Sequence, residues 1–142
     1  MIYFDAAYIA RLYFEDSGWE KVRALAGQAP VACSIHGYAE VVAVMHRKLR
    51  EGFLAAAHYR QTMEQFTVDC EEDAYRWLPL APAVNDRMKK VYLKLPRKVF
   101  LRASDALHLA CAAENSLLEI YTNDQRVLAA APYFGLRGID II

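Results

Sequence analysis

Three aspartates stand where the chain could bring carboxylates together. Asp5 follows a short apolar run, Asp124 follows another that ends near Thr122, and Asp105 begins an alanine- and leucine-rich segment. Each could be only a helix cap, because Asp is favoured at the start of a helix. Helices that follow parallel strands, however, begin along one edge of the sheet, where open α/β folds bind ligands. We therefore expect the three carboxylates to converge there.

Glu40 is a fourth acidic candidate. Glu51 has Arg47 and Lys48 one turn before it, as expected for a solvated helical charge, whereas no Lys or Arg lies one turn from Glu40. We therefore interpret Glu40 as an unpartnered carboxylate and a candidate ligand. Helical periodicity alone fits an ordinary surface position equally well.

Such a cluster of acids has a chemical consequence. Carboxylates within about 5 Å repel one another and raise one another's pKa, so a native cluster normally needs a cation. Oxygen ligands suit Mg²⁺ or Mn²⁺, which activate water and hold phosphate in phosphodiester hydrolysis. We expect Asp5, Glu40 and Asp105 to be the principal ligands, with Asp124 as a second-site ligand or water orienter. Relief of repulsion would make Asp105→Asn melt higher than the wild type without metal.

The elements that position these acids follow from the apolar pattern. Tyr38, Val41, Val42, Met45 and Leu49 recur at helical spacing before Gly52, which predicts an amphipathic helix over 37–51. Strands are expected over 2–4, 31–34, 117–122 and 136–142, and further helices over 6–13, 18–26, 54–77, 83–95, 103–115 and 125–131. Alternation of strands and helices indicates a mostly parallel sheet covered on both faces. We therefore predict a three-layer α/β/α fold forming a single domain over 1–142.

Composition narrows the class of protein. The chain has 142 residues, with 17 basic and 17 acidic side chains, so no global positive field indicates a nucleic-acid binder. Three widely spaced cysteines, Cys33, Cys70 and Cys111, indicate neither a disulfide framework nor a zinc site and fit a reducing cytoplasm. The amino terminus lacks the pattern of a secretory signal, and no apolar run is long enough to predict membrane insertion.

A local basic strip interrupts this neutral composition. Seven basic residues and no acid occur between positions 87 and 104, with two aromatic residues among them. This combination is used to hold single-stranded nucleic acid, so we predict that RNA phosphates contact Lys89, Lys90, Arg97 and Lys98. The alternative is a solvated helix face balanced by the acidic residues between positions 69 and 73.

Four segments in order resemble the PIN-domain family, and more narrowly its VapC-type toxin ribonucleases, over nearly the whole chain. The first and last segments each contain an aspartate after a strand-like run, the second contains a serine and a helical glutamate, and the third is the most specific. The segments are Ile2-Tyr3-Phe4-Asp5-Ala6, Ser34 with Tyr38-Ala39-Glu40-Val41, Arg102-Ala103-Ser104-Asp105-Ala106-Leu107-His108-Leu109-Ala110, and Tyr121-Thr122-Asn123-Asp124 with Arg126.

The resemblance implies a parallel sheet between helices and an Mg²⁺- or Mn²⁺-dependent endoribonuclease. It also implies a homodimer that a small antitoxin protein inhibits. One departure concerns the hydroxyl that the family commonly carries just after its first aspartate, where this chain has Ala6, Ala7 and Tyr8. We expect Ser34 and Thr122 to provide supporting hydrogen bonds instead.

Other interpretations stay open at this point. A receiver-like signalling domain also uses an acidic Mg²⁺ pocket, but no lysine occurs in the last predicted strand. A catalytically weakened RNA- or protein-binding module would explain the lost hydroxyl, and a role in RNA processing would need the same chemistry as a toxin. We interpret His108 as a packed, hydrogen-bonded residue and not as a metal ligand.

Overall fold

The centre of the protein is a parallel β-sheet, described by a computed structural model of all 142 residues. One part is formed by β1 (Ile2–Tyr3), β2 (Val31–Ser34) and β3 (Tyr75–Leu78), in the order β1-β2-β3. β4 (Glu119–Tyr121) pairs in parallel with β5 (Arg137–Ile139). A parallel bridge between Phe4 and Tyr121 joins the two parts, so the strands lie in the order β3-β2-β1-β4-β5.

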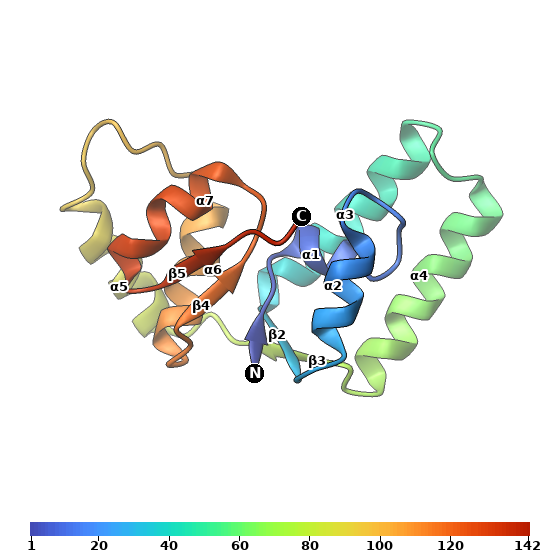
Figure 1. Ribbon diagram of the computed structural model, residues 1–142, viewed down its shortest axis with the longest axis horizontal. Helices are drawn as coiled ribbons and strands as arrows, with labels where there is room; N and C mark the ends of the chain where they lie inside the picture. The colour runs from blue at the N-terminus through green and yellow to red at the C-terminus, as the bar shows by residue number, and fades with distance from the viewer.

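Two layers of helices enclose this sheet. One core contains residues of α1, α2, α3 and α4, and the other contains residues of α5, α6 and α7. Figure 1 shows these groups as two lobes, with β1 rising between them from the N-terminus. The helices are α1 (Ala6–Ala10), α2 (Trp19–Ala26), α3 (Ile35–Arg50), α4 (Ala56–Glu71), α5 (Pro82–Tyr92), α6 (Ala103–Glu114) and α7 (Gln125–Ala130), and a 3-10 turn follows at Ala131–Phe134. None of them combines the length and apolarity that crossing a bilayer requires.

Alternation along the short strands explains the two cores. Tyr3 and Ala32 pack with α6, whereas Phe4 and Cys33 pack on the opposite face with α1 and α3. Successive side chains of a strand point to opposite faces, so strands of this kind are apolar throughout. The predicted three-layer α/β/α architecture with a parallel sheet is confirmed.

One strand departs from the sequence prediction. Residues 54–77 were expected to be mostly helical, but α4 ends at Glu71 and β3 begins at Tyr75. Asp73 takes a left-handed conformation, with φ of 57°, and this reverses the chain between the two elements. β3 pairs with β2 alone, at an edge of the sheet, where partly exposed side chains weaken the apolar signal of a strand.

The junction between the two parts of the sheet is narrow. Beside the bridge from Phe4 to Tyr121, the amide of Asp5 donates a hydrogen bond to the carbonyl oxygen of Tyr121 over 3.1 Å. We call this junction the β1–β4 seam. Asp5 and Thr122 directly follow the paired residues. The seam therefore ends at the carboxyl end of the sheet, where α1 and α7 begin.

Candidate active site

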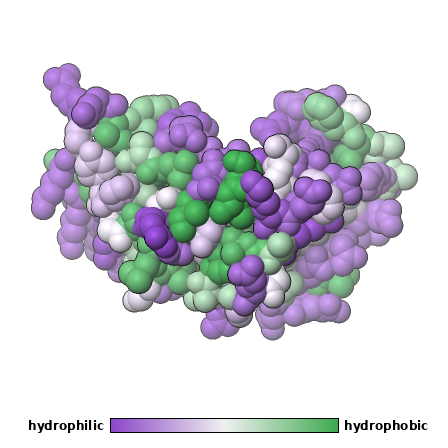
Figure 2. All heavy atoms as spheres, viewed as in Figure 1, coloured by the Kyte–Doolittle hydropathy of each residue, from purple (hydrophilic) through white to green (hydrophobic).

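The four predicted acids line a single pocket of about 440 Å³ at the carboxyl end of the sheet. Asp5 is the N-cap of α1 and Asp124 is the N-cap of α7, while Asp105 lies in the first turn of α6 and Glu40 in α3. Each helical layer therefore contributes two carboxylates. Figure 2 shows a notch between the two lobes at the upper edge of the molecule.

Asp5 is one of two buried acids in the group, and Asp105 is the other. Its carboxylate accepts hydrogen bonds from the backbone amide of Tyr8, at 2.8 Å, and from the hydroxyl of Thr122. Burial raises the pKa of Asp5, although both hydrogen bonds act in the opposite direction. No lysine or arginine is among these partners, so the ionised carboxylate is solvated only by neutral donors.

Thr122 occupies a central position between two acids. Its hydroxyl donates to Asp5 and accepts a hydrogen bond from the backbone amide of Asp124 over 3.0 Å. Ser34, the other expected hydroxyl, lies elsewhere, with its Oγ atom 2.6 Å from Nδ1 of His36. The hydroxyl that is missing at Ala6 and Ala7 is thus supplied to Asp5 from the end of β4.

Glu40 has a partner, and the interpretation of an unpartnered carboxylate was wrong. Nε2 of His108 lies 2.7 Å from Oε2 of Glu40, and the His108 side chain is only 4% exposed. Although burial acts in the opposite direction, the hydrogen bond from His108 lowers the pKa of Glu40. The partner lies 68 positions away on α6, so a search for charges one helical turn from Glu40 could not find it.

Asp105 and Asp124 are bound by arginines of the same chain. Arg102 donates two hydrogen bonds to Asp105, at 2.8 and 3.0 Å, and one to Asp124 at 3.1 Å. Arg126 also pairs with Asp124 and, despite opposing burial, holds the pKa of that carboxyl below its usual range. The charge of Asp105 is therefore compensated, and its contacts do not support the expected gain in stability for Asp105→Asn.

A second histidine joins the site beside Glu40. Nε2 of His36 lies 3.1 Å from the carbonyl oxygen of Ser104, and its ring centroid is 4.2 Å from that of His108. His36, Glu40 and His108 offer ligand atoms within 4.8 Å of one another. All four ring nitrogens nevertheless have hydrogen-bond partners within the protein, so the group is satisfied as a network. His36 and Glu40 are four residues apart on α3, a spacing that could have revealed the pair.

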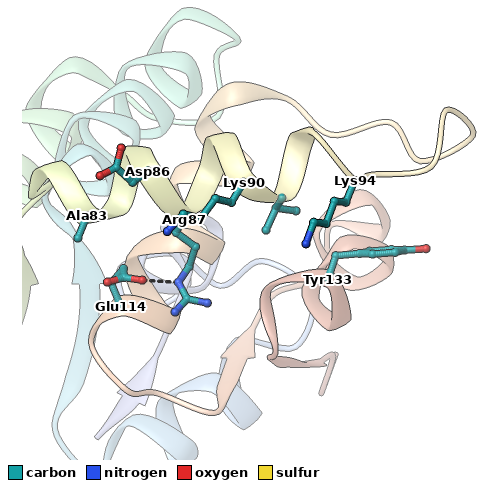
Figure 3. A pocket seen from close by; sticks show the side chains of 8 residues that line it. Ala83, Asp86, Arg87, Lys90, Lys94, Glu114 and Tyr133 are labelled. Atoms are coloured by element: carbon teal, nitrogen blue, oxygen red, sulfur yellow. Dashed lines mark hydrogen bonds and ion pairs between the residues drawn. The ribbon is translucent and has the colours of Figure 1, made fainter.

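The basic strip divides into two regions. Arg102 reaches the carboxylate pocket, and Phe100, which is 65% exposed, lies 5.8 Å from the guanidinium of Arg126. The other end borders a hollow of about 480 Å³ along α5, where Arg87 pairs with Glu114 and Lys94 points toward Tyr133 (Figure 3). The four predicted RNA contacts, Lys89, Lys90, Arg97 and Lys98, are all exposed.

Comparison with solved structures finds the same fold. FitAcB from Neisseria gonorrhoeae is similar with a TM-score of 0.73, 18% identity and coverage of 98% of this chain and 96% of that chain. VapC20 from Mycobacterium tuberculosis, described as a sarcin-ricin loop cleaving toxin, gives a TM-score of 0.68 and 16% identity, with coverage of 92% and 95%. VapBC2 from Rickettsia felis, bound to a promoter DNA fragment, gives 0.68 and 14% identity, with coverage of 99% and 98%.

No curated protein sequence matches the chain significantly. A comparison with family profiles nevertheless supports the same relationship. The PIN domain profile matches residues 2–132, which include all four carboxylates of the pocket. The match covers nearly the whole chain and replaces the receiver-like alternative. The chain therefore belongs to the PIN-domain family.

Proposed function

We propose that the protein is an Mg²⁺- or Mn²⁺-dependent endoribonuclease that hydrolyses RNA phosphodiester bonds. The observation that carries this proposal is the convergence of Asp5, Glu40, Asp105 and Asp124 in one pocket, although they come from four separate helices. Asp5 and Asp124 also have a structural role as helix caps, but helix capping does not explain why all four acids line the same cavity.

The donor set fits a hard cation. Asp5, Glu40 and Asp105 would hold it through carboxylate oxygens, the ligands that Mg²⁺ and Mn²⁺ prefer, and Asp124 would bind a second ion or orient water. The buried charge of Asp5 has only neutral donors, so a cation would compensate it. When bound, the ion would activate a water molecule and neutralise charge on the scissile phosphate.

The protein's own groups would prepare and bind the substrate. Thr122 and the amide of Tyr8 fix the carboxylate of Asp5. Arg102 and Arg126 present guanidinium groups at the edge of the pocket, and such groups bind phosphate oxygens in pairs. The contact from Thr122 supports a working site over a catalytically weakened binding module, because Asp5 has a hydroxyl partner although Ala6 and Ala7 provide none.

Cleavage of a structured RNA by the purified protein tests this function. We expect cutting in millimolar Mg²⁺ or Mn²⁺ and none in chelator, because the proposed reaction depends on the ion to activate water and to neutralise charge on the phosphate. Undiminished cutting in chelator would contradict a metal-dependent mechanism. A contaminating nuclease is excluded by carrying Glu40→Gln through the same purification, since this variant loses one of the pocket carboxylates.

We also propose that the protein is the toxin of a type II pair, acting in the cytoplasm as a homodimer that a small antitoxin inhibits. This proposal is supported by the likeness to FitAcB and to a toxin–antitoxin complex from Klebsiella pneumoniae. The Klebsiella structure gives a TM-score of 0.62 at 18% identity, with coverage of 98% of this chain and 96% of that chain. Arg102 already shows that a guanidinium fits between Asp105 and Asp124, so an antitoxin arginine would compete for the same carboxylates. Co-expression with the product of a small adjoining reading frame, followed by light scattering, tests both the antitoxin partner and the homodimer.

The exposed cations of the strip give a quantitative prediction for RNA binding. Each phosphate contact with single-stranded RNA contributes about 0.7 to the slope of log affinity against log salt, so neutralising four contacts should reduce the slope by about 3. The variant replaces Lys89, Lys90, Arg97 and Lys98 with glutamine, and binding is measured by fluorescence anisotropy in chelator at several salt concentrations.

A matched control separates these contacts from the loss of net charge. Replacing four cations outside the strip with glutamine changes the net charge equally, and we expect the salt slope of that variant to stay close to the wild type. These cations are Lys21, Arg50, Arg60 and Arg76, all exposed. Equal slopes in wild type and strip variant would show that the strip is only a solvated surface.

A further inference from the structure

A buried chain of hydrogen bonds connects the sheet to Glu40. The backbone amide of Ser34 donates to Oη of Tyr3 over 3.0 Å, and this oxygen lies 2.8 Å from Nδ1 of His108. The other ring nitrogen, Nε2, lies 2.7 Å from Oε2 of Glu40. These hydrogen bonds therefore connect β2, through residues of β1 and α6, to a carboxylate of the pocket.

The protonation of Nε2 follows from its partner. An ionised carboxylate only accepts hydrogen bonds, so Nε2 must carry the proton that lies between it and Glu40. The contact between Tyr3 and Nδ1 holds the plane of the ring, and the Tyr3 ring meets it edge-on at 82° with 5.9 Å between centroids. The donor is thus fixed in both position and orientation, because Tyr3 and His108 are both buried.

Gly37 shows that the fold makes room for this imidazole. A Cβ atom at position 37 would lie 3.1 Å from Cε1 of His108 and would collide with Sγ of Cys33. The space beside α3 that holds Cys33 and the edge of the imidazole therefore exists only because residue 37 has no side chain. Glu40 lies one turn further along α3, within reach of Nε2.

We infer that His108 is a positioning residue, which Tyr3 holds in place and which orients the carboxylate of Glu40 toward the cation of the pocket. This inference rests on the proposed metal-dependent function. One oxygen of Glu40 is committed to Nε2 of His108, so the other would be available to the cation, and the side chain would lose less rotational freedom when the ion binds. Direct ligation by His108 would require the ion to displace this hydrogen bond.

Mn²⁺ binding by the full-length protein, measured by electron paramagnetic resonance, tests the inference. Groups that orient metal ligands typically contribute 10–100-fold to affinity, so we expect His108→Leu to bind Mn²⁺ about 10–100-fold more weakly. His108→Gln keeps an N–H donor near the position of Nε2 and should recover most of this loss. Tyr3→Phe retains the imidazole but removes the nearest partner of Nδ1 and leaves the longer contact with Ser34 Oγ at 3.3 Å, so its affinity should fall between those of the wild type and His108→Leu.

RNA cleavage and melting separate positioning from a purely structural role. At saturating Mn²⁺ the cleavage rate of His108→Leu should recover, because the Glu40 carboxylate is still present, whereas Glu40→Gln should stay inactive. Melting in chelator identifies any variant that fails to fold, and His58→Leu, at an exposed histidine of α4, is the matched control.

The outcomes distinguish this inference from the function on which it rests. Wild-type protein that neither binds Mn²⁺ nor cuts RNA would overturn both. Wild-type protein that does both, with unchanged Mn²⁺ affinity in folded His108→Leu, would overturn the positioning role alone. Weaker binding in His108→Leu with no recovery in His108→Gln would also overturn it and would instead indicate direct ligation by the imidazole.

Discussion

Asp5→Asn should abolish metal-dependent RNA cleavage and yet make the metal-free protein melt at a higher temperature. Even groups outside the ligand shell contribute 10–100-fold to metal affinity or activity, so losing a ligand should reduce cleavage by more than about 100-fold. The gain in stability has a separate cause. Burial raises the folded-state pKa of Asp5 above its unfolded value, so the stability that Asp5 contributes is lost as pH rises through the folded pKa. A neutral asparagine avoids this loss and can still accept the hydrogen bond from Tyr8.

Thermal melts in chelator and in Mg²⁺ test this prediction. Binding to the folded state alone should stabilise the wild type by about 1.4 kcal/mol when free Mg²⁺ is ten times its Kd, and Asp5→Asn should gain little. Asp86→Asn, on the exposed surface of α5, is the matched control and should change neither property. A lower melting point for Asp5→Asn in chelator would show that Asp5 acts mainly as a helix cap.

Removing Arg102 should tighten metal binding. Its guanidinium bridges Asp105 and Asp124 and so occupies carboxylates that the ion needs. Arg102→Ala should bind Mn²⁺ about tenfold more tightly. This factor corresponds to the low end of the interaction energy of two unit charges about 4 Å apart, which is ~1 kcal/mol in water and ~4 kcal/mol near a protein surface. We choose the low end because solvent screens this half-exposed side chain. Titration with Mn²⁺, followed by electron paramagnetic resonance, measures the change.

Two further variants define the role of Arg102. Arg102→Lys keeps the charge but not the planar fork that bridges both acids, so its Mn²⁺ affinity should lie between those of the wild type and Arg102→Ala. Arg87→Ala removes an arginine that pairs with Glu114 in the α5 hollow and should leave metal affinity unchanged. Weaker Mn²⁺ binding in Arg102→Ala would mean that Arg102 organises the acids for the ion and does not compete with it.

The sequence predicted the architecture where local patterns are strong. The apolar spacing in α3 and the alternation of strands with helices were enough to predict a parallel sheet between two helical layers. β3 was missed because an edge strand of four residues follows an acidic segment that is compatible with a helix. Strand pairing depends on distant residues, which local periodicity does not contain.

The candidate site shows the same division between local and distant information. The four acids could be chosen because each stands at the start of a helix or has a distinctive neighbourhood. Their partners could not, because the contacts of Glu40 with His108 and of Asp5 with Thr122 span 68 and 117 positions. The partners Arg102 and Arg126 lie only three and two residues from Asp105 and Asp124, so these two ion pairs are contained in the local sequence.

The β1–β4 seam gives the site a property that resembles chelation by a divided ligand. Asp5 and Glu40 belong to one helical layer and Asp105 and Asp124 to the other, while Phe4 and Tyr121 form the bridge between the two parts of the sheet. Affinity for the proposed ion then depends on the effective concentration at which these carboxylates are presented to one another. If the seam opens, Asp124 parts from Asp5, whereas α6, which carries Asp105, stays packed against Tyr3 and Ala32. A partly unfolded chain would therefore offer the ion fewer carboxylates, and the proposed hydrolysis would depend on the closed, native molecule.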